Sequence, residues 1–437
     1  MDIYKEYKNR RKNLADKIGD GIAIISNSDE SSRNRDCEYP FRSDSYFHYL
    51  CGFPEPEAVI LIVGGAQPRS IIFCKSKDIS KEIWNGYIYG PGDAAKKFLF
   101  EESYPLHEIN KIAPKILKPY KNIYCVPSMI PCNTSSKTRD SIKKWTVNSS
   151  EIKCCDLTEI LDQMRCLKSN GEINIMQKSA NIAAQAHIHA MGITKPGKYE
   201  SQIEGEILNQ FMQNGARYPA YNSIVASGDN ACTLHYVKND CILKDGDLIL
   251  IDAGCELDNY ASDITRTYPI NGKFTSPQKD IYQIVLDAQK EAIKKVMPGN
   301  YFNDPHKVAI EKIVNGLIDL NILKASRDEV FEKELYKDFF MHRTSHWLGL
   351  DVHDAGQYHD KKVESRNLKP VKFHDSNVLT VEPGLYIKPY SNTPKEFWGI
   401  GIRIEDDVLV TPSGNKVLSA NAPKEIKDLE DTVGSLN

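Results

Sequence analysis

Apolar positions along the first 165 residues have the spacing of short strands that alternate with short helices. AVILIV (58–63) and SIIFC (70–74) are β-branched runs bounded by glycine or proline, which predicts strands. Residues 91–102 and 106–117 predict short helices. The stretch 127–150, rich in Ser, Thr, Lys and Pro, predicts a loop and a surface helix. This part of the chain is therefore expected to form a compact α/β domain.

The pattern of apolar positions changes near residue 166, where longer helical segments begin. Two capping-box spacings, Ser169 with Glu172 and Ser201 with Glu204, each open a predicted helix. A third helix is predicted over 276–297, with a proline in its first turn. Strands are predicted at 247–254, 262–270, 377–387 and 401–411. The expected domains are residues 1–166 and 167–437.

Composition narrows the class of protein. A chain of 437 residues exceeds one ordinary core, which agrees with two domains. The net charge of −3, with scattered lysines, gives no support for nucleic-acid binding. The longest apolar run, 58–63, is far shorter than the roughly 20 residues of a membrane span, and the charged N-terminus is unlike a secretory signal. We expect a cytoplasmic protein without membrane contact, whose 11 cysteines are free thiols.

A first pair of carboxylates lies within apolar strands. DLILIDAG (247–254) is apolar enough to be buried on both faces, yet it carries Asp252, and Asp263 follows in the next predicted strand. A turn near 257–259 would make these strands a hairpin in which the two aspartates face each other. Buried carboxylates that face each other repel unless a cation lies between them. The competing interpretation is one surface aspartate and one capping aspartate.

A second pair repeats this arrangement. Thr380 and Glu382 share one face of NVLTVEPG, and Arg403 and Glu405 share one face of GIRIEDD. The polar connection 388–398 allows a second hairpin, in which Glu382 and Glu405 would converge. Two hairpins that each present paired carboxylates favour a metal site much more strongly than one does.

The segment SHWLGLDVHD (345–354) supplies a nitrogen ligand. Four carboxylates carry a charge of −4, which two divalent cations balance, and a neutral His346 completes the set. Oxygen-rich ligands with one imidazole favour Mn²⁺ or Co²⁺, with Zn²⁺ or Fe²⁺ as alternatives. Two such ions can bridge and deprotonate a water that then attacks a carbonyl carbon. His235 and His353 are available to assist, and Glu382 could also accept a proton.

Other histidine patterns are weaker evidence for a metal site. His342 and His346 form H-x-x-x-H, but Arg343 stands where a single-zinc protease needs glutamate, and the downstream glycine argues against a helix. We therefore reject the single-zinc interpretation. His187 and His189 are interpreted as ordinary helix residues.

In this order, IDAG, SDITRT, SHWLGLDVHD, VEPGLYI and GIRIEDD resemble the metal-binding motifs of the pita-bread-fold metallopeptidases. Within that superfamily the chain is most similar to the bacterial Xaa-Pro aminopeptidases, also called aminopeptidase P. Residues 33–62 and EIWNGYIYGP (82–91) resemble that family's N-terminal domain. The resemblance implies an α+β protein: a creatinase-like N-terminal α/β domain and a C-terminal pita-bread catalytic domain with a curved antiparallel sheet.

The resemblance also implies roles for individual residues. A dinuclear Mn²⁺ centre would be held by Asp252, Asp263, His346, Glu382 and Glu405, with Asp263 and Glu405 bridging. His235 and His353 would bind substrate and stabilise the tetrahedral intermediate, and Arg403 would order the site. His342, with Tyr386 nearby, would line the pocket for the proline ring. Trp84 would reach the active site of a neighbouring subunit, which implies a homo-oligomer, either a dimer or a tetramer. Arg343 and Thr344 depart from the small or apolar residues usual after His342.

The implied activity is removal of the N-terminal residue from peptides with proline in the second position. The bond before proline is a tertiary amide without an N–H, so enzymes that need that donor fail on it. The alternative is prolidase, which cleaves Xaa-Pro dipeptides with the same ligands. A binding module of this fold that has lost its ligands is a second alternative, which the filled ligand positions oppose. Creatinase acts without metal, and methionine aminopeptidase lacks a comparable N-terminal domain.

Overall fold

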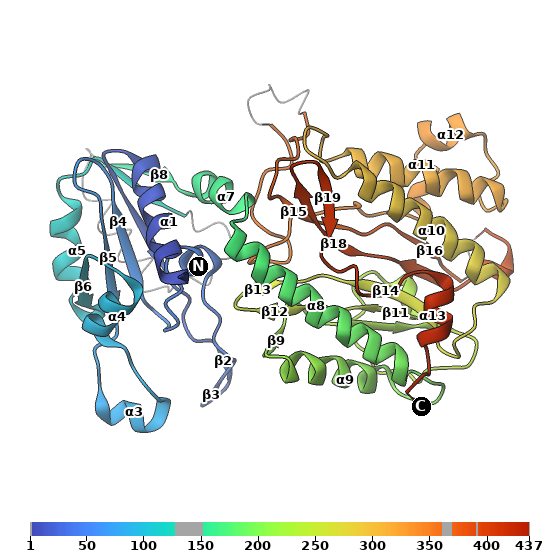
Figure 1. Ribbon diagram of the computed structural model, residues 1–437, viewed down its shortest axis with the longest axis horizontal. Coiled ribbons are helices and arrows are strands. Elements are labelled where there is room, and N and C mark those ends of the chain that lie inside the picture. Colours follow the sequence, from blue (N-terminus) through green and yellow to red (C-terminus); the bar gives the residue numbers. More distant parts are fainter. Residues whose placement is uncertain (1, 127–151, 361–368, 390–391, 437) are drawn as a thin grey trace. The chain divides into compact units, whose positions relative to one another are not determined.

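The computed structural model describes residues 2–126, 152–360, 369–389 and 392–436. It divides into two compact units, Met1–Arg165 and Cys166–Asn437, which Figure 1 shows in sequence colours. The loop and surface helix predicted at 127–150 lie outside the described residues. Among the described helices, none has the length and apolar character needed to cross a membrane.

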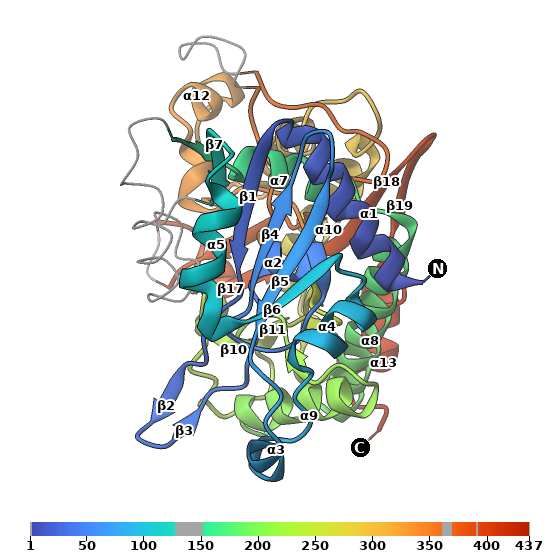
Figure 2. The same ribbon diagram turned by 90° about the vertical axis from the view of Figure 1, so that its left-hand side faces the viewer.

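The N-terminal unit is built on one mixed sheet of order β6-β5-β4-β1-β7-β8. Figure 2 shows its strands β1, β4 and β5 side by side. The strands predicted at 58–63 and 70–74 and the helices predicted at 91–102 and 106–117 are confirmed within a few residues, although the second helix begins as a 3-10 turn. Its elements in chain order are α1 (Ile3–Ile18), β1 (Gly21–Ser26), β2 (Ser32–Asn34), β3 (Cys37–Glu38), α2 (Ser45–Cys51), β4 (Val59–Val63), β5 (Arg69–Cys74), α3 (Ile79–Asn85), α4 (Gly90–Phe98), β6 (Glu102–Pro105), η1 (Leu106–Glu108), α5 (Ile109–Leu117), β7 (Asn122–Cys125), β8 (Lys153–Asp156) and α7 (Thr158–Cys166).

The first residues of three helices in the second unit are set by capping boxes. Ser169 caps α8 in the predicted capping box with Glu172, and Thr275 caps the predicted third helix. The second box is wrong: Tyr199 with Gln202 caps α9, so Ser201 lies inside the helix. The helices are α8 (Asn170–Ile193), α9 (Glu200–Gln213), η2 (Gly228–Cys232), α10 (Ser276–Lys295), α11 (Asp304–Asp319), α12 (Arg327–Glu332), η3 (Leu335–Asp338), η4 (Lys395–Phe397) and α13 (Ile426–Thr432).

The strands of the second unit are shorter than predicted. Each of the four predicted strands has a core in the expected place, but 377–387 is split after Val381 and 401–411 is split after Arg403. The outer halves pair with each other, and so do the inner halves, with Val381 opposite Asp406 and Gly384 opposite Arg403. The strands are β9 (Tyr218–Pro219), β10 (Ile224–Ser227), β11 (Leu248–Asp252), β12 (Cys255–Leu257), β13 (Tyr260–Ala261), β14 (Thr265–Pro269), β15 (Val378–Val381), β16 (Gly384–Ile387), β17 (Ile400–Arg403), β18 (Asp406–Thr411) and β19 (Gly414–Val417).

The predicted turn between the aspartates is confirmed. Leu257 pairs with Tyr260 around Asp258 and Asn259, both of which have positive φ. Beyond a short irregular stretch, β11 pairs antiparallel with β14, and Asp252 lies opposite Thr265. The two strands predicted as one hairpin thus become a ladder that is interrupted at 253–254 on one strand and at 262–264 on the other.

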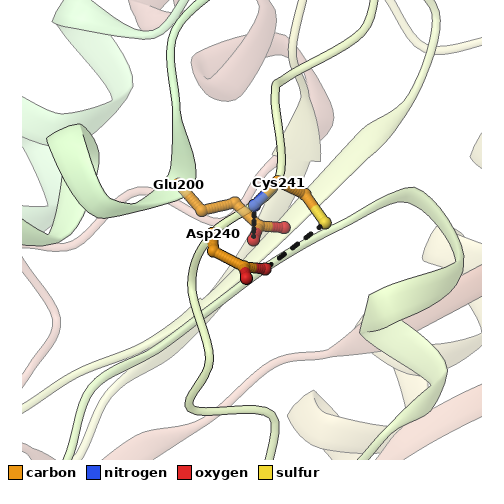
Figure 3. Close-up of side chains that lie close together, drawn as sticks. All are labelled: Glu200, Asp240 and Cys241. Atoms are coloured by element: carbon orange, nitrogen blue, oxygen red, sulfur yellow. Dashed lines mark hydrogen bonds between the residues drawn. The ribbon is translucent and has the colours of Figure 1, made fainter.

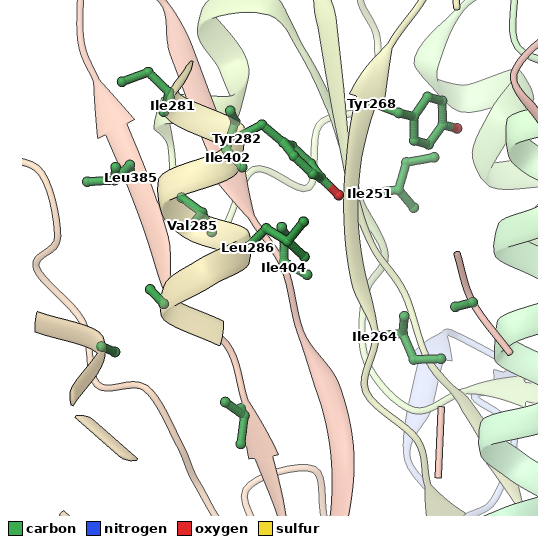
Figure 4. Packing of buried hydrophobic residues seen from close by; sticks show 14 of the residues in the cluster. Ile251, Ile264, Tyr268, Ile281, Tyr282, Val285, Leu286, Leu385, Ile402 and Ile404 are labelled. Atoms are coloured by element: carbon green, nitrogen blue, oxygen red, sulfur yellow. The ribbon is translucent and has the colours of Figure 1, made fainter. Parts of the chain in front are cut away.

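Strand alternation separates a core face from a site face. Ile251, Leu385, Ile402 and Ile404 belong to the main buried apolar cluster, which also takes in Tyr282, Val285 and Leu286 of α10. Figure 4 shows these α10 side chains beside Ile402 and Ile404. Because neighbouring residues of a strand point to opposite faces, the polar residues between these apolar ones point away from the apolar core. That opposite face carries the site.

Candidate metal centre and active site

All five predicted metal ligands line one cavity of about 980 Å³ in the second unit. The cavity is also lined by His235, His342, His353 and Arg403. Tyr386 is fully buried and lies within hydrogen-bonding distance of His342. Trp84 lies on α3 of the other unit and is 86 % exposed. The described residues of the second unit therefore bring together every predicted site residue except Trp84.

Asp252 and Asp263 face each other, as the hairpin argument predicts. The hydroxyl of Tyr221 lies 2.5 Å from Oδ1 of both carboxylates, so one phenol connects the two. Burial, followed by the charges of the two aspartates, raises the pKa of Tyr221 well above its usual value, which keeps the phenol protonated as a donor. The interpretation as one surface and one capping aspartate is wrong, because both carboxylates are buried in the cavity wall.

His346 lies between two of the carboxylates. Its Nε2 is 3.4 Å from Oδ2 of Asp263 and 3.6 Å from Oε1 of Glu382. Its Nδ1 lies 3.0 Å from the carbonyl oxygen of Trp347, so an Nδ1–H donor leaves Nε2 as the atom that faces the cavity. Donor atoms of Asp263, His346 and Glu405 all lie within 4.8 Å of one another, close enough to share one ion. As expected, the 341–350 segment is not helical.

Burial, reinforced by repulsion between the carboxylates, dominates the electrostatics of this cluster. Burial, with the repulsion of neighbouring carboxylates, raises the pKa of Glu382 to about 7 and that of Glu405 well above its usual value. Burial alone would lower the pKa of His346, but Asp263 and Glu382 outweigh it and raise that pKa to about 9. The cluster thus holds excess negative charge that protons partly neutralise. Divalent cations could neutralise this charge in place of the protons, because oxygen donors with one imidazole nitrogen are a donor set that such ions bind.

A chain of directed hydrogen bonds runs from Arg403 to His342. Nη2 of Arg403 donates to Oδ2 of Asp252 at 2.6 Å, and its Nη1 donates to the Tyr386 hydroxyl at 3.0 Å. That hydroxyl lies 2.9 Å from Nε2 of His342, whose Nδ1 is 2.8 Å from the carbonyl oxygen of Arg343. Burial, then the charge of Arg403, lowers the pKa of His342 to about 3. The imidazole is therefore neutral and fixed in one tautomer.

His235 and His353 approach the same cavity from other segments. The His353 ring lies 4.2 Å from that of His346, and burial with the neighbouring imidazoles lowers the pKa of His353 to about 4. His235 is exposed on the loop between β10 and β11. By contrast, His187 is buried on α8, where its Nε2 bonds to the carbonyl oxygen of Ala253 behind the site. This agrees with its interpretation as a structural helix residue.

Three residues that support the ligands were missed by the sequence argument. Tyr221 is one of them. Thr265 donates to Oε2 of Glu405 at 2.6 Å and accepts from Nε of Arg403 at 3.2 Å. The carboxylate of Asp407 accepts the backbone N–H of Asp263 at 3.1 Å. Thr265 and Asp407 lie within the motifs that carry the ligands, so strand alternation could have indicated Thr265, whereas Tyr221 has no periodic signal.

Comparison with known proteins agrees with this geometry. Residues 174–412 match metallopeptidase family M24, and residues 7–124 match the aminopeptidase P N-terminal domain. The chain is 44% identical over 429 residues to the Xaa-Pro aminopeptidase of Haemophilus influenzae, covering 98% of this chain and 96% of that protein. It is 40% identical over 436 residues to the Xaa-Pro aminopeptidase of Escherichia coli, covering 98% and 97%.

Solved structures give the same result. Proline aminopeptidase P II from Yersinia pestis superposes with a TM-score of 0.94 at 39% identity, covering 99% of this chain and all of that one. A variant of Escherichia coli aminopeptidase P in complex with substrate has a TM-score of 0.92 at 37% identity, covering 98% of each chain. These likenesses confirm the expected fold: an aminopeptidase P N-terminal α/β domain followed by a pita-bread catalytic domain. The chain therefore belongs to metallopeptidase family M24, among its Xaa-Pro aminopeptidases.

Proposed function

We propose that the enzyme removes the first residue from peptides whose second residue is proline, with two Mn²⁺ ions held by Asp252, Asp263, His346, Glu382 and Glu405. The observation that carries this proposal is the convergence of four carboxylates and one imidazole on one cavity. Two divalent ions would balance the formal charge of −4, and Asp263 and Glu405 would be the carboxylates that contact both. Co²⁺ and Zn²⁺ are the competing metals.

The metal ions would supply an activated water and polarise the scissile carbonyl. Glu382 lines the cavity among the ligands and is assigned to accept a proton on a carboxylate oxygen and to pass it to the leaving nitrogen. Neutral His353 has an N–H available for the carbonyl oxygen of the substrate, and His235 lines the same cavity. Both are assigned to substrate binding and to stabilising the tetrahedral intermediate.

His342 is assigned to the proline ring. Its imidazole lies against the Phe340 ring, with 5.0 Å between centroids, and is fixed by Tyr386. A rigid, neutral aromatic wall can pack against the apolar pyrrolidine ring, and this contact does not require an N–H donor from the substrate. Arg403 holds both Tyr386 and Asp252, so it couples this wall to the ligands.

The decisive experiment compares an Xaa-Pro dipeptide with an Xaa-Pro-Xaa tripeptide, each with added Mn²⁺ and with chelator. Cleavage of the tripeptide before proline, lost with chelator, is the expected result. Cleavage of the dipeptide alone would make the protein a prolidase, and cleavage of neither would favour a binding module. Reconstitution of metal-free protein with Mn²⁺, Co²⁺ or Zn²⁺ then ranks the metals by turnover.

Variants test the ligand assignment. Asp263→Ala is expected to lose both bound metal and activity, while Asp280→Ala, an exposed aspartate of α10, should keep both. Two metals retained by the first variant, measured by elemental analysis, would refute the assignment.

The homo-oligomer is a further part of the proposal. None of the α3 residues is buried, and Ile79, Ile83 and Trp84 are 75%, 81% and 86% exposed. Such an apolar helix surface suits contact with a neighbouring copy, where Trp84 is assigned to the partner's active site. Trp84→Ala should weaken a dimer or tetramer in sedimentation experiments, and an unchanged assembly with unchanged turnover would contradict this role.

A further inference from the structure

His235 reaches the cavity from a segment without regular structure. Between η2 and β11, residues 233–247 form no helix and no strand. His235 itself is exposed, yet it lines the same cavity as the ligands. Backbone hydrogen bonds to residues 197–200 hold the segment at 241–243, but no ladder runs through residues 233–240, so side chains contribute the anchors nearest to His235.

The main anchor is Glu200, the first residue of α9, which is fully buried. Its Oε1 accepts from the backbone N–H and the hydroxyl of Ser227, both at 2.7 Å, and from Nδ2 of Asn230 at 3.1 Å. Its Oε2 accepts from the Tyr236 hydroxyl at 2.8 Å and from the backbone N–H of Cys241 at 2.9 Å. One carboxylate thus gathers five donors.

These donors are spread along residues 227–241, called the 227–241 loop below, which run from the end of β10 through η2 and past His235. Ser227 and Asn230 precede His235, Tyr236 is its direct neighbour, and Cys241 follows. Glu200 therefore holds both ends of the loop and the residue next to the imidazole. Hydrogen bonds to an ionised acceptor are the stronger kind, about twice the strength of neutral ones.

A second carboxylate on the same helix face supports the first. Glu204, one helical turn further, accepts from Nδ2 of Asn239 at 3.0 Å. Asn239 is buried with a positive φ, and its Oδ1 accepts the backbone N–H of Val225. Glu204 thus contacts the loop, and because α9 already begins at Glu200 it does not complete a capping box with Ser201. One face of α9 thus acts as a frame for the loop.

An alternative use of Glu200 is metal binding, because Asp240 and Cys241 have donor atoms within 4.8 Å of it (Figure 3). Both oxygens of Glu200 are, however, already occupied by N–H and O–H donors, and Asp240 and Cys241 are exposed. The hydrogen bonds of this cluster are those of an anchor.

We propose that Glu200 is the positioning residue for His235: its carboxylate fixes the 227–241 loop so that the imidazole meets the substrate in the cavity. This inference rests on the proposed function, in which His235 contacts the substrate. Glu200 itself lines no part of the cavity and takes no chemical step.

Glu200→Gln is the sharpest perturbation, because it keeps the size of the side chain and replaces one acceptor oxygen with an NH₂ donor. Either the Ser227 and Asn230 donors or the Tyr236 and Cys241 donors then lose their acceptor. A misplacement of about 1 Å at such a site can cost about 100-fold, so kcat/KM for the tripeptide is expected to fall about 10- to 100-fold. Bound metal should be unchanged, since no ligand is touched.

A double-mutant cycle separates positioning from general damage. In a His235→Ala background, Glu200→Gln is expected to change kcat/KM by less than about threefold, because the group that it positions is gone. Glu206→Gln is the matched control: it lies on the same helix and its carboxylate pairs only with His189 among the described contacts, at 3.3 Å. This control should stay within twofold of the wild type in both backgrounds.

Two further readouts keep the test decisive. Amide hydrogen exchange of residues 228–241 should accelerate in Glu200→Gln and not in Glu206→Gln, while exchange in β11 stays unchanged. Should Glu200→Gln fail to fold, Tyr236→Phe removes a single donor, and its loss of kcat/KM should likewise vanish in the His235→Ala background.

Equal losses in both backgrounds, or unchanged exchange of the loop, would overturn the positioning role. Failure of the proposed function is a different result, since the wild-type enzyme itself would then cleave neither substrate.

Discussion

Gly254 lies at the break of the ladder that carries the two aspartates, and alanine there should separate them. A Cβ built on Gly254 would lie 1.7 Å from the carbonyl oxygen of Ser262 and 2.5 Å from its carbonyl carbon. Real Cβ contacts are essentially never shorter than 3.0 Å, so the two backbones must move apart by about 1.3 Å. Both obstacles are backbone atoms, which no rotamer change can move.

The cost follows from what the shift disrupts. Overpacking of a tight site typically costs about 1–3 kcal/mol. The 262–255 backbone hydrogen bond at 3.0 Å and the 253–264 one at 3.1 Å would lengthen, at about 1 kcal/mol each. The expected loss of stability is therefore about 3–5 kcal/mol. Because the shift lies between Asp252 and Asp263, metal affinity should also fall, by about 10- to 100-fold.

The assay combines thermal unfolding with elemental analysis of dialysed protein. Gly205→Ala is the matched control: Gly205 is an exposed residue inside α9 with no atom within 4 Å of an added Cβ. That control should gain about 0.5–1 kcal/mol, since alanine is the better helix former. A Gly254→Ala protein with wild-type metal content and wild-type unfolding temperature would refute the close-approach argument.

Three further predictions concern buried polar groups. Tyr221→Phe removes the hydroxyl shared by two ligand carboxylates and should weaken metal binding about 10-fold, as checked by competition with a chelating dye. Burial lowers the pKa of His187 to about 4, below its unfolded value of about 6.5, so stability should fall by up to about 3 kcal/mol as pH drops through that interval. His187→Gln should flatten this dependence in urea titrations at pH 7 and pH 4.5, and an unchanged slope would contradict it. Asp406→Asn leaves the buried guanidinium of Arg266 without its counter-charge and should cost about 3–5 kcal/mol in denaturant unfolding, whereas Asp280→Asn should cost less than 0.5 kcal/mol.

Strand alternation explains why so much of the site could be predicted. Ile402 and Ile404 face the core, so Arg403 and Glu405 must face away from it, and the same parity applies to Glu382 beside Val381. Apolar runs that carry charged residues at alternate positions indicate a buried polar face from the sequence alone. The convergence of the pairs followed from this parity and from the turns between the strands.

The breaks in the strands could not be predicted in the same way. Glu382 and Glu405 stand where the ladder changes partners, between the Val381–Asp406 pair and the Gly384–Arg403 pair. The break depends on which strands pair in the folded protein, while the local sequence alone predicts two continuous strands. Tyr221 comes from a segment without periodicity, and the capping residue of α9 is Tyr199, which is not one of the usual capping types. The strand breaks and the position of Tyr221 are set by contacts between residues far apart along the chain.

The wide separation of the ligands along the chain has a consequence for folding. Asp252 and Glu405 lie far apart in the catalytic unit's sequence, and His346 lies between them. The loops that must close before these groups meet are long, so the centre has high contact order and should assemble late and slowly. Metal uptake would then report completed folding of the whole unit, and a chain stalled before Glu405 would carry no complete centre. Because ions bind only the assembled state, they would also stabilise it by mass action, and metal supply during refolding should raise the yield of native enzyme.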